Sequence, residues 1–229
     1  MSDTLLASLS LLATLGFYYL TKLAYRRKKV IWLAPMLAAP LAIIALVLSL
    51  HIPLDDYYLY THFLVLMLGP ATIAFAVPIY QERDVIRRYP FTLAIGVCTG
   101  LLLGLISSWI LVQIFPMPKE LAEGMMVRSV STPFAVEAVA AFGGVPDITA
   151  MLVIMTGIIG MAVSEPVFKL AKIRTPLAKG IALGAASHGA GTAKAHELGR
   201  EEGVIASLTM IFTGVAMVLC APLFAGVLG

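Results

Sequence analysis

Two stretches of small and polar residues decide the fold of this chain: RSVSTPFAVEAVAAFGGVPD at residues 128–147 and PLAKGIALGAASHGAGTAKAHELGREE at residues 176–202. Neither is apolar enough for a helix that faces lipid. Neither has the composition of a surface loop, because alanine, glycine and valine dominate. Irregular backbone at membrane depth is tolerated only where protein surrounds it. Both stretches are therefore predicted to be re-entrant or broken half-helices inside a membrane protein.

The rest of the chain is apolar enough to cross a membrane several times. Of its 229 residues 60% are hydrophobic and only 13% are charged, whereas a soluble domain carries about 25% charged residues. Six apolar runs approach or exceed the roughly 20 residues that a spanning helix needs. They cover residues 4–24, 31–50, 62–80, 91–114, 148–168 and 203–228. The sequence predicts an all-α polytopic membrane protein with about six spanning helices, the third interrupted at Pro70 and Pro78.

The two polar stretches belong to a weak internal repeat. A shift of 56 residues without gaps aligns residues 131–168 with residues 187–224 and gives seven identities in 38 positions. The matches include a serine before each half-helix, a glycine at its end, and Pro-x-Phe near the end of the following apolar run. Two unrelated helices rich in alanine and glycine remain the alternative.

Positive charges favour the re-entrant interpretation. If both polar stretches enter and leave on the same side, 14 of the 16 Lys and Arg residues lie inside and 2 outside. If both stretches cross fully, the division is 10 to 6. Cytoplasmic loops carry the excess of Lys and Arg. The repeats are then predicted to be inverted, as in many secondary transporters.

The start of each half-helix predicts an anion site. Ser131, Thr132 and Pro133 are typical of a helix N-terminus, which predicts a short helix that ends at Gly143. The second motif opens with Ser187 and predicts a helix to about residue 198. The free N–H groups and positive dipole of two such N-termini would bind a small carboxylate. The predicted substrate-binding residues are Ser131, Thr132, Pro133, Ser187, His188, Gly189, Gly191 and Thr192. Capping of buried helix ends is the alternative role for the Ser and Thr residues.

Three charged residues are candidates for charge or proton coupling. Arg128 precedes the first half-helix and is expected either to attract anions at the outer mouth or to extend to the membrane interface. Glu137 and Lys194 lie within the half-helices, where charge is costly. A buried Glu137–Lys194 pair is the structural alternative. His188 is a candidate for proton coupling or for a neutral hydrogen bond to a carbonyl.

Other classes of function are not expected. There is no Cys/His spacing for a metal, no nucleophile motif and no phosphate loop, so neither an enzyme nor a cofactor is predicted. The sequence also has none of the basic-aromatic patterning of nucleic-acid binders. Gly96, Gly100 and Gly104 could form a helix-packing face, either between copies of the chain or, more simply, within one copy.

The polar motifs resemble the LrgB/CidB family of bacterial membrane proteins. The resemblance rests on Arg128-Ser129-Val130-Ser131-Thr132-Pro133 and on Ala186-Ser187-His188-Gly189-Ala190-Gly191-Thr192-Ala193. Ser131 replaces a family threonine, and Arg128 stands where the family often has lysine. The resemblance implies either holin/antiholin-like regulation of murein hydrolase export and lysis, or carriage of small carboxylates, as in the related plastid glycolate/glycerate translocator. It also implies a small partner membrane protein of the LrgA/CidA type.

The first hypothesis is a secondary transporter of small monocarboxylates such as pyruvate, glycolate or lactate. The alternative is a holin-like pore or lysis regulator. The chain is predicted to form one membrane domain over residues 1–229, with scaffold or dimerisation helices in 1–115 and the core in 125–229. The expected location is the bacterial inner membrane, with both termini outside. A homodimer is expected.

Overall fold

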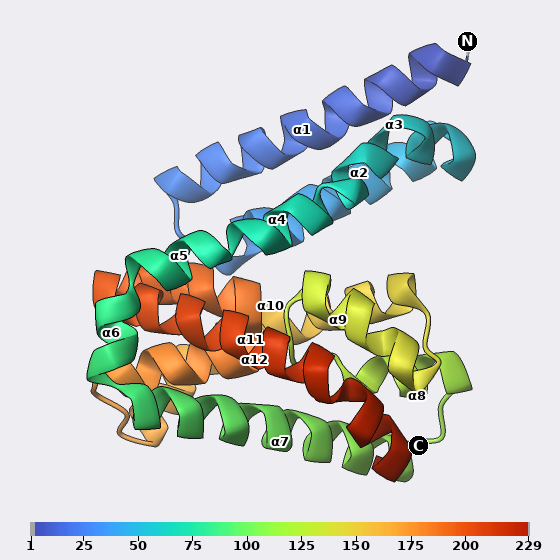
Figure 1. The fold of residues 1–229 in the computed structure, drawn as a ribbon. Helices are drawn as coiled ribbons and strands as arrows, with labels where there is room; N and C mark the ends of the chain where they lie inside the picture. Colours follow the sequence, from blue (N-terminus) through green and yellow to red (C-terminus); the bar gives the residue numbers. More distant parts are fainter. Residues whose placement is uncertain (1–2, 229) are drawn as a thin grey trace. The chain divides into compact units, whose positions relative to one another are not determined.

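The computed structural model describes residues 3–228, which form helices with no strand among them (Figure 1). Five helices are long and apolar enough to cross a membrane. They are Thr4–Arg27, Leu54–Gln81, Pro90–Ile114, Pro146–Leu170 and Arg200–Val227. The predicted span 31–50 forms a 3₁₀ turn and a shorter helix instead. The prediction of an all-α polytopic membrane protein is confirmed, and contacts divide the chain into two compact units between Ala71 and Thr72.

The N-terminal unit contains four α-helices or parts of them. Its elements are α1 (Asp3–Arg27), η1 (Ile31–Leu33), α2 (Pro35–Ser49), α3 (Leu54–Leu66) and the start of α4 (Leu68–Ala74). Helix α1 packs against α2 and α3. The Thr14 hydroxyl lies 3.2 Å from the Tyr57 hydroxyl and joins α1 to α3. Residues 51–61, which separate the second and third predicted spans, largely form the first turns of α3.

The prolines interrupt the predicted third span, as expected. Helix α3 ends at Leu66, α4 ends at Ala74, and α5 (Ala76–Gln81) follows. A proline lacks the N–H that would bond to the carbonyl four residues earlier, and its ring clashes with that carbonyl. For Pro70 and Pro78 these carbonyls belong to Leu66 and Ala74, the last residues of α3 and α4.

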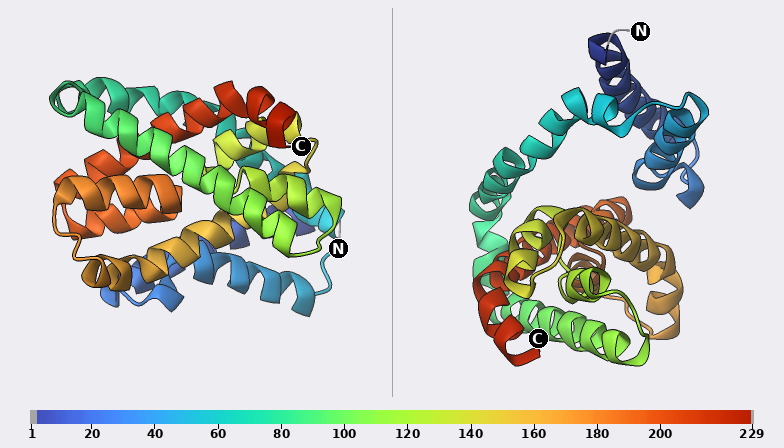
Figure 2. Two further views of the ribbon diagram at one scale, coloured as in Figure 1. Left: turned by 90° about the horizontal axis from the view of Figure 1, so that it is seen from below. Right: turned by 90° about the vertical axis from the view of Figure 1, so that its right-hand side faces the viewer.

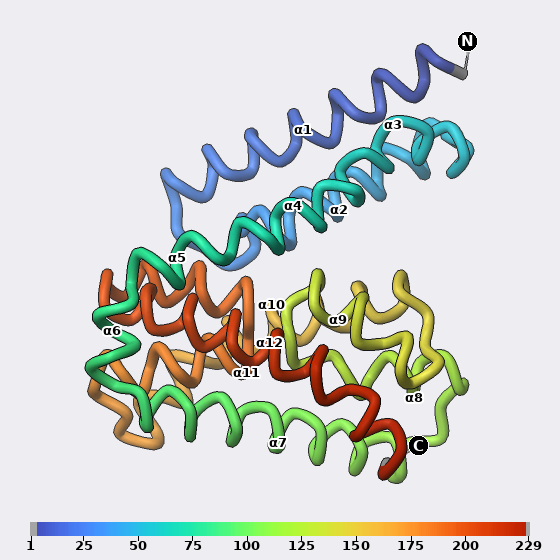
Figure 3. The backbone as a smooth tube through the Cα atoms, viewed as in Figure 1, coloured from blue at the N-terminus to red at the C-terminus, as the bar shows by residue number. Residues whose placement is uncertain are grey.

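The C-terminal unit holds the remaining helices around α12. Its elements after α5 are α6 (Arg83–Arg88), α7 (Pro90–Ile114), α8 (Lys119–Met126), α9 (Thr132–Val139), η2 (Ala140–Phe142), α10 (Pro146–Leu170), α11 (Pro176–Leu198) and α12 (Arg200–Leu228). Figure 3 traces α12 through this unit from the α11 end to the α8 end. Helix α12 packs against α7, α9 and α11, and α10 packs against α8, α9 and α11. Helix α7, assigned from sequence to the N-terminal scaffold, thus groups with the core.

Phe134 anchors the apolar core of this unit. Its side chain is buried, and its ring stacks on Phe75 of α4–α5 with centroids 5.9 Å apart. The ring also lies against Gly214 of α12, where a methyl group would stand 2.5 Å from Phe134 Cγ. The first turn of α9 is therefore fixed against the middle of α12.

Candidate functional site

The first polar stretch forms the returning arm of a helical hairpin. Helix α9 begins after Ser131 in extended conformation. The chain turns at Gly143, whose φ of 81° favours glycine. A methyl group at the next residue, Gly144, would stand 3.2 Å from the backbone nitrogen of Gly124 in α8. The end of the α9 arm thus lies beside α8.

The second polar stretch doubles back in the same way. Helix α11 is broken at His188, whose φ of 34° and ψ of −118° are not helical. Residues 183 and 191 would lie about 12 Å apart along an unbroken helix. Instead, a methyl group at Gly191 would collide with the carbonyl oxygen of Leu183. The break at His188 therefore turns α11 into two arms, Pro176–Ser187 and Gly189–Leu198.

The two hairpins lie at opposite ends of α10 (Figures 1 and 2). The α8–α9 hairpin leads through Gly144 directly into the first residue of α10, Pro146, whereas α11 begins shortly after the last, Leu170. Near its start, α11 packs against the first turn of α12, because a methyl group at Gly180 would stand 2.8 Å from the carbonyl oxygen of Glu202. The hairpins therefore approach the middle of the unit from opposite directions.

The hairpin tips contact two long helices, α10 and α12, near their midpoints. A methyl group at Gly157, next to the central residue of α10, would stand 2.7 Å from Cε1 of His188. The Thr192 hydroxyl lies 3.6 Å from the Met210 sulfur near the middle of α12. Phe134 reaches the central residue of α12, Gly214. Both tips therefore pack near the middle of helices that are long and apolar enough to cross a bilayer.

A glycine stripe on α7 brings the two tips together. Methyl groups at Gly104 and Gly100 would stand 2.7 Å from Ser129 Cβ and 2.5 Å from Ala185 Cβ. These glycines are one turn apart, about 6 Å along the helix. The segment before α9 and the end of the first α11 arm thus lie consecutively on one face of α7. This stripe packs within the chain, which confirms the simpler of its two interpretations.

Three polar residues at the tips are buried without hydrogen-bond partners. Ser131 is the N-cap residue of α9, yet its hydroxyl makes no capping hydrogen bond. Ser131 Oγ, Ser129 Oγ and His188 Nε2 are buried, and none has a partner among the described residues. Such a group costs about 1–3 kcal/mol when it is left unsatisfied. Capping does not account for Ser131, and the three groups are available to a polar ligand.

The other predicted binding residues surround the two breaks. Thr132 and Pro133 open α9 and are half-buried, whereas Ser187 is buried against Gly160 of α10. Gly189 is half-buried, and no atom lies within 4 Å of the position that its Cβ would occupy. The backbone just after the α11 break is therefore approachable. The strained conformation of His188 costs of order 1–3 kcal/mol, and such strain clusters at functional sites.

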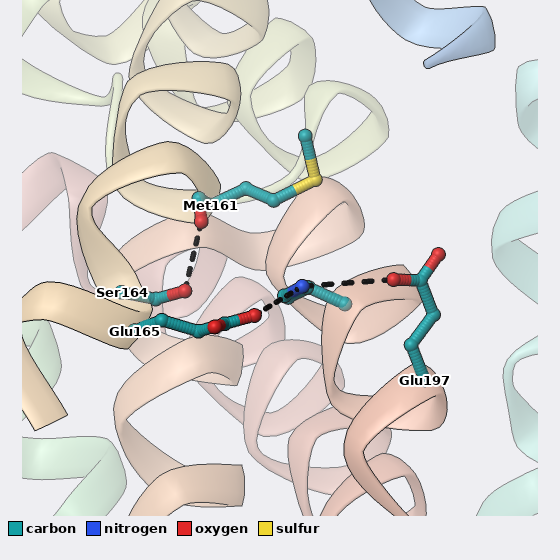
Figure 4. Close-up of polar contacts among 5 residues, drawn as sticks. Met161, Ser164, Glu165 and Glu197 are labelled. Atoms are coloured by element: carbon teal, nitrogen blue, oxygen red, sulfur yellow. Dashed lines mark hydrogen bonds and ion pairs between the residues drawn. The ribbon is translucent and has the colours of Figure 1, made fainter. Parts of the chain in front are cut away.

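The charged candidates are not brought together. Lys194 lies 2.6 Å from Glu165 of α10 and 3.7 Å from Glu197, as the dashed lines in Figure 4 show. Glu137 is exposed. The suggested Glu137–Lys194 pair is therefore wrong, because Lys194 ties the second α11 arm to α10 instead.

Arg128 lies at a cavity of about 890 Å³ within the C-terminal unit. Its guanidinium donates a hydrogen bond to Ser107 Oγ at 3.2 Å, while its Nε is buried without a partner among the described residues. Besides Arg128, the cavity is lined by Ser129 of the first tip and Ala185 and Ala186 of the second. None of the eight predicted binding residues lines this cavity, so the sequence predicted the tips and not the cavity beside them.

Comparisons with known proteins match nearly the whole chain. A profile of the LrgB-like family matches residues 14–227, and so extends well beyond the C-terminal motifs. The chain is 34% identical over 215 residues to the uncharacterized protein YwbG of Bacillus subtilis (strain 168), covering 94% of this chain and 95% of that protein. It is 32% identical over 223 residues to the uncharacterized protein YxaC of the same organism, covering 97% and 94%. No solved structure matches. This multi-pass membrane protein therefore belongs to the LrgB-like family.

Proposed function

We propose that this protein is a secondary transporter of small monocarboxylates such as pyruvate, glycolate or lactate. The observation that carries the proposal is the meeting of two hairpin tips at the midpoints of α10 and α12, with Ser129, Ser131 and His188 unpartnered there. Transporters bind substrate at the bilayer midplane between discontinuous helices. A carboxylate would accept hydrogen bonds from the serine hydroxyls and from a His188 tautomer that carries its proton on Nε2.

The path of the chain supports alternating access. Each hairpin is attached at one end of α10 and reaches the centre, so movement of the core against other helices would expose the tips to each side in turn. The inverted relation of the two repeats is part of this proposal. Both repeats contain a short helix and then a long helix with a proline inside it, at Pro166 and Pro222.

The holin-like alternative needs a lipid-exposed packing face for oligomers. The glycine stripe of α7 was its candidate, but Gly96, Gly100 and Gly104 are covered by Ile181, Ala185 and Ser129 of the same chain. This occupied stripe favours the transporter over a pore.

The proposal also covers assembly and location. We propose that the protein forms a homodimer, works with a small partner of the LrgA/CidA type, and lies in the inner membrane with both termini outside.

Uptake of labelled pyruvate into proteoliposomes tests the function. We expect saturable uptake, and a loss of at least about tenfold in Ser131→Ala and His188→Ala, because each variant removes a group that binds the carboxylate. Thr132→Ala tests the neighbouring hydroxyl in the same assay. Glu120→Gln, which changes an exposed residue of α8, serves as a control. A large leak without saturation would support the pore, and unchanged uptake in all three site variants would exclude this site.

A further inference from the structure

Arg128 is a half-buried cation without an anionic partner. Among residues 3–228, its side chain takes part in no ion pair, and its one hydrogen bond goes to the neutral hydroxyl of Ser107. Its Nε is buried and unpartnered. A guanidinium in a membrane interior is costly unless an anion pairs with it. The charge of Arg128 is therefore balanced only when an anion binds beside it in the cavity.

Arg128 shares the cavity lining with several hydroxyl groups. Ser107 accepts its hydrogen bond, Ser129 follows it in the chain, and Thr92, Thr99, Thr156 and Thr175 also line the cavity. The Ser129 hydroxyl is more than nine-tenths buried and has no partner among the described residues. A carboxylate beside Arg128 could accept hydrogen bonds from two guanidinium N–H groups and from one serine hydroxyl.

Most of the remaining lining is apolar, and the cavity is large. Leu103 and Ile95 of α7 and Leu177 and Ile181 of α11 line it, and Arg128 is its one charged lining residue. A single cation pairs with a single carboxylate, so a dicarboxylate would leave its second charge against apolar walls. A volume of about 890 Å³ is in the range that holds drug-sized ligands, and it far exceeds the needs of pyruvate.

We propose that Arg128 binds the substrate carboxylate, and that the α7–α11 cavity accepts the apolar tail of monocarboxylates longer than pyruvate, such as 4-methyl-2-oxopentanoate. This inference rests on the proposed function and adds the substrate class. Each buried methylene contributes about fourfold in affinity. Three added carbons therefore predict about 10- to 60-fold tighter binding than pyruvate, whereas succinate binds weakly.

Binding of labelled acids to the full-length protein in nanodiscs tests this inference. Arg128→Gln is expected to weaken binding of the six-carbon acid by about 10- to 100-fold. Arg128→Lys should recover part of the loss, because it restores charge without the fork. Lys119→Gln removes an exposed charge of α8 and should bind as the wild type does. Unchanged binding in Arg128→Gln would overturn the assignment.

A second pair of variants tests the cavity without touching the charge. Leu103→Trp enlarges an exposed side chain that lines the cavity and should weaken the six-carbon acid at least about fivefold more than pyruvate. Leu102→Trp, at the neighbouring position, which is also exposed but does not line the cavity, is its matched control. Equal affinity for pyruvate, the six-carbon acid and succinate would overturn the inference. Saturable pyruvate uptake that persists in Arg128→Gln would refute it while leaving the proposed function standing, whereas no saturable uptake in the wild type would refute the function itself.

Discussion

Gly157→Ala should disturb the α11 break, because the added methyl group has no room. It would stand 2.7 Å from His188 Cε1 and 3.3 Å from Ala190 Cβ, whereas carbon atoms pack best about 3.5–4.0 Å apart. The imidazole must therefore move by about 1 Å. Overpacking of this kind costs about 1–3 kcal/mol, and the better helix propensity of alanine returns about 1 kcal/mol. The net expectation is destabilisation by about 0–2 kcal/mol.

Gly226→Ala is the matched control for this prediction. No atom lies within 4 Å of the position of its Cβ, so alanine there should stabilise α12 by up to about 1 kcal/mol. Unfolding in mixed micelles with increasing dodecyl sulfate, followed by circular dichroism, compares the two variants. We expect Gly157→Ala to be about 1–3 kcal/mol less stable than Gly226→Ala and to lose pyruvate uptake. Equal stabilities together with unchanged uptake would refute the packing of His188 on α10.

Two further substitutions test the contacts that hold the hairpins. Phe134→Ala should destabilise the protein by about 3–5 kcal/mol, because it empties a buried ring site; Phe91→Ala, at an exposed position, should cost far less in the same unfolding assay. Lys194→Ala should cost no more than about 1 kcal/mol, because its partner Glu165 is half exposed and solvent screens the pair. The control Lys119→Ala, at an exposed position, should change the unfolding free energy still less. A loss of several kcal/mol for Lys194→Ala would contradict the view that this ion pair is weak.

The sequence predicted the helical elements because local rules determine them. Pro70 and Pro78 interrupt the third span where the missing N–H groups require it. The first half-helix ends at Gly143 in a left-handed conformation, and the second arm of α11 ends at Leu198. Each of these features depends on a residue and its near neighbours along the chain.

The pairing of charges and the cavity could not be predicted in this way. Lys194 and Glu165 lie on different helices, so their meeting depends on the fold of α11 back against α10. The cavity forms between α7, α10 and α11, and its lining is spread over residues 92–186. One signal was present in the sequence: the small residues Gly157 and Gly160 of α10 mark the face that admits the α11 tip.

Cross-linking of the two tips tests the central claim most directly. The claim is that Ser129 and Ala185 contact α7 at Gly104 and Gly100, about one helical turn apart, and line one carboxylate site. Ser129→Cys and Ala185→Cys are combined in a chain in which serine replaces Cys98 and Cys220, and the protein is treated with a short bis-methanethiosulfonate reagent.

We predict rapid cross-linking of this pair within the monomer, and slower cross-linking when pyruvate or 4-methyl-2-oxopentanoate occupies the cavity. As a control, Lys119→Cys and Lys172→Cys are combined in the same cysteine-free chain. Lys119 begins α8 and Lys172 follows the last residue of α10, so these two cysteines should not be cross-linked to each other. The account is contradicted if the tip pair fails to cross-link, or if its rate is the same with and without saturating monocarboxylate.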